Sequence, residues 1–225
     1  MVNKLSKAEN LKKLADAIVS GDETAAKTSA QKLMDSGVDP LEAILKGVTE
    51  GLNIVGKKYE AKEYFYPDLV CGADAALTAM NVIKPHIKRG TMEYRGTFVI
   101  GTVEGDLHDI GKGLVGAMLE ANGFNVVDIG VNVPAAKFGE AVKKYNANLV
   151  GSSATLSGGV KMEQKKIQEQ LVAAGVRNKI GYVIGGVVAD SEWARVIGAD
   201  AYGKDCVEAV RICLELMQKL REGKK

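Results

Sequence analysis

The chain has 225 residues, of which 46% are hydrophobic and 26% charged, so it can bury a sizeable core as one large domain or two small ones. Thirty basic and 28 acidic residues leave a formal charge of +2, and the lysines alternate with apolar positions, which argues against a nucleic-acid partner. No apolar run is long enough to span a bilayer and the amino terminus lacks the apolar core of a signal peptide, so we expect a cytoplasmic protein with no membrane partner.

Helical periodicity dominates residues 1–89. Apolar residues recur three or four positions apart along several segments, which predicts about four helices joined by short loops in a bundle. Helix breakers separate these segments at Gly21-Asp22, Gly37, Asp39-Pro40 and Pro67. The first 89 residues therefore predict a helical-bundle domain that ends near Arg89-Gly90.

Apolar strands alternate with helices in residues 90–225. The expected strands lie at residues 97–103, 125–129, 149–153, 182–186 and close to 201–202. This βαβ repetition predicts an α/β, Rossmann-like domain with a five-stranded parallel sheet. Periodicity alone does not distinguish a flavodoxin-like strand order from other doubly wound orders.

A carboxylate stands two residues before one of only two histidines, directly after the first expected strand. In Asp106-Leu107-His108-Asp109-Ile110-Gly111, His108 is placed at the carboxyl end of a strand, where open α/β sheets bind their ligands. A histidine that binds a metal through one ring nitrogen usually donates its other N–H to a carboxylate, and Asp106 is close enough in the chain to accept it. Asp109 could instead act only as the N-cap of the following helix.

The chain has few other histidine and cysteine side chains, the kinds that commonly bind zinc ions. Cys71, Cys206 and Cys213 form no Cys-x-x-Cys pair and are expected to be free thiols, and the second histidine is His86. A zinc site is therefore poorly supplied. A metal is better explained as part of a macrocycle that brings most of its own ligands and takes one axial ligand from the protein.

Four segments follow one another in the carboxyl-terminal part of the chain. They are Gly105-Asp106-Leu107-His108-Asp109-Ile110-Gly111-Lys112, Val127-Asp128-Ile129-Gly130-Val131-Asn132-Val133-Pro134, Val150-Gly151-Ser152-Ser153 and Ile184-Gly185-Gly186. Together they resemble the corrinoid (cobalamin-binding) proteins of methylamine, methanol, betaine and O-demethylase methyltransferase systems. They are also similar to the cobalamin-binding module of methionine synthase. The resemblance extends over nearly the whole length.

The resemblance implies a flavodoxin-like strand order and a set of cofactor-binding residues. His108 is the implied lower axial ligand of cobalt, supported by Asp106, with Asp109, Ile110 and Gly111 completing the loop. Ser153 would either extend the hydrogen-bond relay or touch the nucleotide tail of the cofactor. The second set of cofactor-binding residues is Ser153, Thr155, Gly185 and Gly186. The two glycines could equally serve only a tight turn.

The helical domain is implied to cap the upper face of the corrin and to swing aside when a partner docks. Phe65 and Leu69 are the candidates for contact with the corrin, although each could be plain bundle core. The hinge is expected at Lys88-Arg89-Gly90.

The implied function is a methyl carrier and not a complete enzyme. Its base-off, His-on cobalamin would alternate between cobalt(I) and methyl-cobalt(III). A substrate-specific methyltransferase would load the methyl group, a second one would pass it to tetrahydrofolate or coenzyme M, and a reductive activator would rescue cobalt(II). The small subunit of an adenosylcobalamin mutase, a cobalamin sensor, and a flavodoxin-like domain without a corrin are the alternatives.

The sequence departs from the family pattern in two loops. Thr155, followed by Leu156, stands where the family often has leucine, and Val187-Val188 stands where it often has Ala-Pro. These departures concern contacts to the nucleotide tail and leave the set of Asp106, His108 and Gly111 intact.

Overall fold

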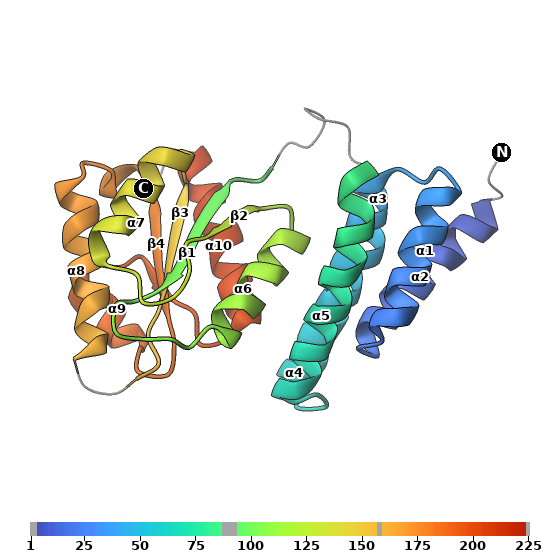
Figure 1. Ribbon diagram of the computed structural model, residues 1–225, viewed down its shortest axis with the longest axis horizontal. Helices are drawn as coiled ribbons and strands as arrows, with labels where there is room; N and C mark the ends of the chain where they lie inside the picture. Colours follow the sequence, from blue (N-terminus) through green and yellow to red (C-terminus); the bar gives the residue numbers. More distant parts are fainter. Residues whose placement is uncertain (1–3, 87–93, 157–158, 224–225) are drawn as a thin grey trace. The chain divides into compact units, whose positions relative to one another are not determined.

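Two compact units make up the protein, seen here in a computed structural model that describes residues 4–86, 94–156 and 159–223. The units span Met1–Glu93 and Tyr94–Lys225 (Figure 1). The predicted boundary and hinge at residues 88–90 lie outside the described residues. No helix in the described ranges is long and apolar enough to cross a membrane.

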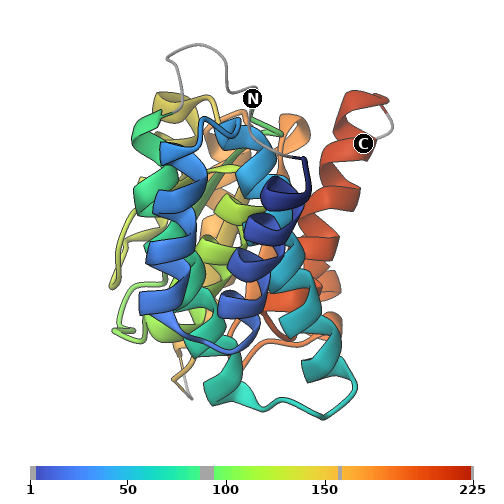
Figure 2. The ribbon, with the colours of Figure 1, turned by 90° about the vertical axis from the view of Figure 1, so that its right-hand side faces the viewer.

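The first unit is the expected helical bundle. Its elements are α1 (Lys4–Val19), α2 (Glu23–Asp35), α3 (Pro40–Ala43), a π-helical turn η1 (Ile44–Thr49), α4 (Glu50–Glu60), α5 (Tyr66–Ile83) and a 3-10 turn η2 (Lys84–His86). Because α3, η1 and α4 follow one another without a break, they form one long helix, and the prediction of four helices is confirmed. Figure 2 looks onto this unit, where the blue to teal helices α1, α2, α4 and α5 lie side by side.

The helix starts follow from capping residues. The carboxylate of Asp22 accepts the Ala25 N–H at 2.9 Å at the start of α2, and that of Asp39 accepts the Leu41 N–H at 2.9 Å at the start of α3. At the start of α5 the Asp68 carboxylate accepts the Phe65 N–H at 2.7 Å. Each bond satisfies an N–H that would otherwise lack a partner in the helix or just before it.

The second unit contains a five-stranded parallel sheet. Its strands are β1 (Thr97–Thr102), β2 (Asn125–Asp128), β3 (Leu149–Ser153), β4 (Gly181–Gly185) and β5 (Ala201–Tyr202), each within one residue of the prediction. They lie in the order β2-β1-β3-β4-β5, which is the flavodoxin-like order that the resemblance implied. The sheet reverses its direction of growth between β1 and β3, so a ligand site is expected at the carboxyl ends of these two strands.

Helices cover both faces of the sheet. Figure 1 shows α7 (Ala135–Tyr145), α8 (Val160–Ala173) and α9 (Ser191–Ile197) on one face, and α6 (Ile110–Ala121) and α10 (Cys206–Arg221) on the other. A 3-10 turn, η3 (Arg177–Lys179), precedes β4. On the α7 and α8 side, Val99, Val150 and Tyr182 of the sheet are buried in one cluster with Phe138 and Leu171 of the helices. Buried on both faces, the strands hold the loops at their carboxyl ends on a rigid base.

Candidate functional site

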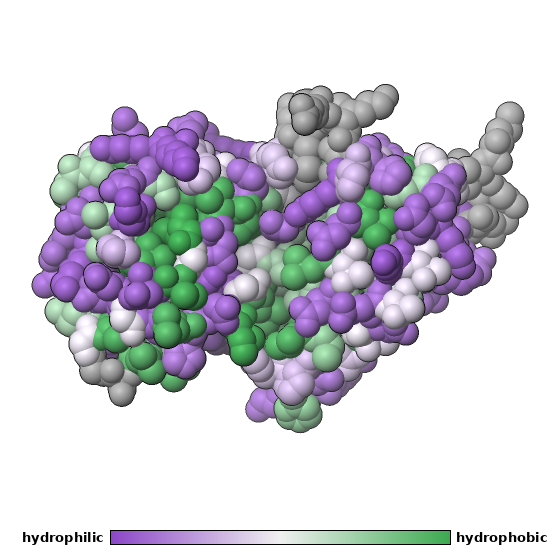
Figure 3. Space-filling model, viewed as in Figure 1, coloured by the Kyte–Doolittle hydropathy of each residue, from purple (hydrophilic) through white to green (hydrophobic). Residues whose placement is uncertain are grey.

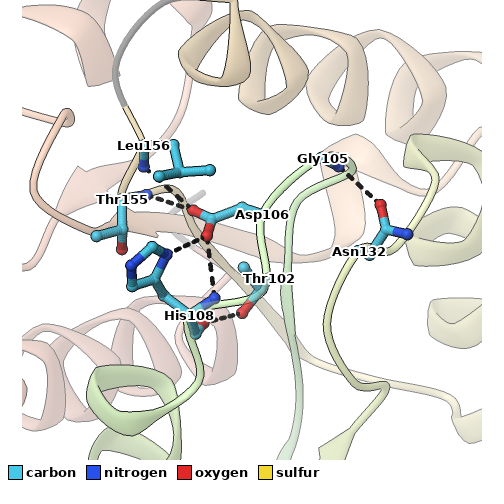
Figure 4. A network of polar contacts seen from close by, with 7 residues as sticks. All are labelled: Thr102, Gly105, Asp106, His108, Asn132, Thr155 and Leu156. Carbon is cyan, nitrogen blue, oxygen red and sulfur yellow. Dashed lines mark hydrogen bonds and ion pairs between the residues drawn. The ribbon is translucent and has the colours of Figure 1, made fainter.

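Asp106 and His108 lie together in the loop between β1 and α6, as the spacing predicted (Figure 4). Asp106 is fully buried, and its Oδ1 lies 2.6 Å from the His108 ring Nδ1 and accepts the His108 backbone N–H at 3.0 Å. Since the carboxylate can only accept, the neutral imidazole carries its proton on Nδ1. The contact therefore fixes both the tautomer and the direction of the ring.

The second carboxylate oxygen of Asp106 is held by the loop after β3. Oδ2 accepts the backbone N–H of Thr155 at 2.6 Å and that of Leu156 at 3.4 Å. Burial raises the pKa of Asp106, but the hydrogen bonds from His108, Thr155 and Leu156 outweigh it and hold the pKa below its ordinary value. Asp106 therefore stays ionised while fully buried, because both oxygens have donors.

The imidazole of His108 points out of this buried base. Its main chain is anchored, since the Thr102 hydroxyl donates to the His108 carbonyl at 2.8 Å, while 55% of its side-chain surface is exposed. With Nδ1 bound to Asp106, Nε2 is the ring nitrogen left to bind a metal. The arrangement presents one neutral nitrogen ligand with a fixed direction.

Exposed apolar side chains lie in the loop that carries His108 and in two loops at the same edge of the sheet. Leu107 exposes 71% of its surface and Ile110 exposes 66%, and in the neighbouring loops Leu156 and Val187 are also exposed. A Cβ added to Gly111 would meet no atom within 4 Å. Large exposed apolar side chains at the same edge as one available imidazole nitrogen are suited to a large flat apolar group such as a corrin ring. The residues present thus fit a macrocycle that needs one axial ligand.

A free metal ion would need several ligands from the protein, and the described residues do not supply such a set. In the described ranges no group of three or more histidine, cysteine, aspartate or glutamate side chains comes together in a way that could hold a metal ion. The donor chemistry of the loop is that of one imidazole and one supporting carboxylate.

The Gly185-Gly186 turn packs against the loop that holds Asp106. Gly186 has a φ of +97°, and a Cβ at this position would lie 2.0 Å from the carbonyl oxygen of Ala154. Ala154 in turn donates its N–H to the Gly185 carbonyl at 3.1 Å and directly precedes Thr155. The turn role that the sequence allowed for these glycines is therefore present, and contact with a nucleotide tail stays a prediction.

Other predicted site residues have different surroundings. Asp109 occupies the N-cap position of α6, but its side chain makes no capping hydrogen bond. In the described residues the Ser153 hydroxyl has no hydrogen bond, so the relay from Asp106 passes to backbone amides of Thr155 and Leu156 and not to Ser153. Its contact with the tail is untested and stays a prediction.

The two candidates in the helical unit differ in exposure. Phe65, at the N-cap of α5, exposes 67% of its surface, whereas Leu69 is 2% exposed and lies on the buried face of α5. Phe65 is thus the one with an accessible ring, and contact of either residue with a corrin stays a prediction.

Residues that the sequence did not single out also shape the site. Thr102 anchors the His108 main chain, and Asn132 accepts the Gly105 N–H at 2.8 Å. Gln164 of α8 is fully buried and donates to the Ser152 carbonyl at 3.2 Å and to the Gly185 carbonyl at 3.0 Å, which ties α8 to the ends of β3 and β4. The positive φ of 52° at Asn132 follows a familiar preference of asparagine, but its partner could not be read from the sequence.

Comparison with known proteins matches each of the two units to a B12-binding domain family. The family model "B12 binding domain" matches residues 96–211, and a second B12 binding domain model matches residues 11–84. Trimethylamine corrinoid protein 1 of Methanosarcina acetivorans is 40% identical over 207 residues, which cover 91% of this chain and 95% of that protein. Dimethylamine corrinoid protein of Methanosarcina barkeri is 39% identical over 218 residues, which cover 95% of this chain and the whole of that protein.

A solved structure of another protein resembles this chain over its full length. The methanol:cobalamin methyltransferase complex MtaBC from Methanosarcina barkeri contains a chain with a TM-score of 0.80 and 28% identity, a match that covers 100% of this chain and 90% of that one.

Proposed function

Since this chain belongs to the B12-binding corrinoid proteins of methyltransferase systems, with a corrinoid as its cofactor, we propose that His108 is the lower axial ligand of a methyl-carrying cobalt. The corrinoid, when bound, would supply the chemistry of methyl transfer between two methyltransferases. The observation that carries the proposal is the imidazole of His108, exposed at Nε2 and bound at Nδ1 to buried Asp106 at 2.6 Å.

The protein residues do two things in this proposal. Asp106 holds His108 with Nε2 directed outward, so the ligand nitrogen is in place before the cofactor arrives. If Nε2 were released from the metal, the carboxylate of Asp106 would keep the ring in place through Nδ1, so the same nitrogen would remain directed at the cofactor.

The partners are two methyltransferases and a reductive activator. The MtaBC complex supports a methyltransferase as the loading partner, since it is a methanol:cobalamin methyltransferase complex that contains the matching chain. The names of the two relatives make methylated amines the first methyl donors to test. The second methyltransferase acts on tetrahydrofolate or coenzyme M in this proposal.

The test compares the wild type with His108→Ala after reconstitution with hydroxocobalamin. Electron paramagnetic resonance of the cobalt(II) form should show superhyperfine splitting from one nitrogen in the wild type and none from the protein in His108→Ala. His86→Ala is the matched control, because it removes the other histidine, which lies in η2, and should keep the splitting. Splitting from a nitrogen of the protein that survives in His108→Ala would overturn the proposed ligand.

A further inference from the structure

The loop that carries Asp106 begins with a tight turn. The Asp106 N–H donates to the Val103 carbonyl at 3.2 Å, and Gly105 inside the turn has a φ of +81°. This turn leaves the Gly105 N–H and the Asp106 carbonyl without a partner in the turn itself. Both groups point toward the loop between β2 and α7.

Asn132 bonds to both of these groups. Its backbone N–H donates to the Asp106 carbonyl at 2.9 Å, and its side-chain Oδ1 accepts the Gly105 N–H at 2.8 Å. Figure 4 shows Asn132 reaching Gly105 from the side of the loop opposite Thr155 and Leu156. The main chain at Asp106 is therefore held by Asn132, while its carboxylate is held by Thr155 and Leu156.

Asn132 is itself fixed by pairing with the end of β1. The Thr102 N–H donates to the Gly130 carbonyl at 3.0 Å, the Val133 N–H donates to the Thr102 carbonyl at 3.0 Å, and Val103 and Val133 form a parallel bridge. Asn132 adopts a left-handed φ of 52°, which asparagine tolerates better than other residues with a side chain. The side chain thus starts from a rigid backbone.

Asn132 also lines a groove on the surface of the second unit. The groove has a volume of about 390 Å³ and runs between α7 and the loop after β2, with Ile129, Val131 and Pro134 among its apolar lining. In Figure 3 apolar side chains gather on this face between the positions that Figure 1 labels α7 and β2. Asn132 is thus accessible on one side and bonded to the Asp106 loop on the other.

We propose that Asn132 is a positioning residue: its side-chain oxygen holds the turn at Gly105 and Asp106 so that His108 is aimed at the metal. The inference rests on the proposed function, because the orientation of His108 matters only if the ring binds a metal. The hold of Asn132 on Gly105 and Asp106 depends only on residues of this chain. Loss of the oxygen should loosen the turn without unfolding the sheet, because the backbone bonds of Gly130, Asn132 and Val133 remain.

Two substitutions separate the side-chain oxygen from the backbone conformation. Asn132→Gly keeps the left-handed conformation and removes the acceptor, whereas Asn132→Asp keeps an acceptor oxygen at the same place. Asn146→Gly is the matched control, since Asn146 ends α7 with a φ of 49° and has no place in the site.

The apo protein gives the first readout. Hydrogen exchange at the Gly105 amide should become about three- to ten-fold faster in Asn132→Gly, as expected for the loss of one hydrogen bond. It should stay near the wild-type rate in Asn132→Asp and Asn146→Gly. An unchanged rate in Asn132→Gly, or an equal rise in Asn132→Asp, would overturn the proposal.

The cobalt(II) form gives the second readout. Free imidazole labelled with ¹⁵N competes with His108, and its doublet splitting differs from the triplet of the natural ¹⁴N of the protein. We expect half-displacement of His108 at an imidazole concentration about three- to ten-fold lower in Asn132→Gly than in the wild type, with recovery in Asn132→Asp. An unchanged concentration contradicts the positioning role. If the wild type shows no protein nitrogen at all, the proposed function fails, and the exchange of Gly105 alone decides the role of Asn132.

Discussion

Cys206 and Cys213 on α10 are buried, whereas Cys71 on α5 is exposed. Burial raises the pKa of both α10 thiols to about 12, from an ordinary value of 9.0. In the unfolded chain these thiols ionise near their ordinary pKa, while in the folded chain they keep their protons. Above about pH 9 the unfolded state therefore binds fewer protons than the folded state, and the free energy of unfolding falls as the pH rises.

We expect the two thiols together to lower the free energy of unfolding of the second unit by about 1–2 kcal/mol between about pH 8 and about pH 9.5. Urea unfolding at the two pH values measures the change. The double variant Cys206→Ala, Cys213→Ala should lose this part of the pH dependence. An equal fall in the variant would assign the alkaline loss of stability to other groups.

The sequence predicts the role of a residue that acts through its side chain better than the role of one that acts through its backbone. The pair Asp106 and His108 follows from a spacing of two residues at the end of a strand, and the structure places their side chains 2.6 Å apart. Thr155 was expected to contact the cofactor, yet the atom that contacts Asp106 is its backbone nitrogen. Every residue except proline has such an N–H, so no residue type marks it in the sequence.

At the scale of elements, the turn after β4 tests how one loop supports another. Gly186 and Gly130 share a φ of +97°, so alanine is strained at both positions. Only at Gly186 would the new Cβ meet backbone, at 2.0 Å from the Ala154 oxygen, since a Cβ at Gly130 meets nothing within 4 Å. The comparison of the two alanine variants therefore separates the cost of the clash between the two loops from the cost of the φ angle.

Gly130→Ala should lower the free energy of unfolding by about 1–2 kcal/mol, the usual cost of a left-handed residue. Gly186→Ala should cost at least ~2 kcal/mol more, because the Ala154 backbone must shift. Denaturant unfolding of both variants measures the difference. Equal losses would mean that the loop after β3 yields freely and that the turn does not support Thr155.

Helix limits were predicted well because they depend on local chemistry. Asp22 and Asp39, which lie at two of the predicted breaks between helices, cap α2 and α3. The π-helical turn Ile44–Thr49 was not predicted, and it contains Gly47, where a Cβ would lie 2.6 Å from Leu14 of α1. Here the turn lies where its helix packs against α1, a contact that periodicity does not report. The strand order likewise came from the family resemblance and not from the strands themselves.

At the scale of the whole molecule, all the hydrogen bonds described around His108 come from one unit. Thr102, Asn132 and Thr155 lie in the sheet unit, and so does Gln164 beneath the strand ends. The sheet is covered on both faces by helices of the same unit. The described hydrogen bonds that orient His108 lie within residues 94–225, so this unit supplies the support of the imidazole.

A chain of residues 94–225 alone should therefore fold cooperatively and bind cobalamin through His108. The expected result is a single urea transition and, in the cobalt(II) form, the same one-nitrogen splitting as in the full chain. His108→Ala in the short chain is the control and should abolish that splitting. If the short chain folds but shows no nitrogen splitting, the bundle contributes to ligation directly. Phe65 and Leu69, the predicted contacts to the corrin, are then the next residues to test.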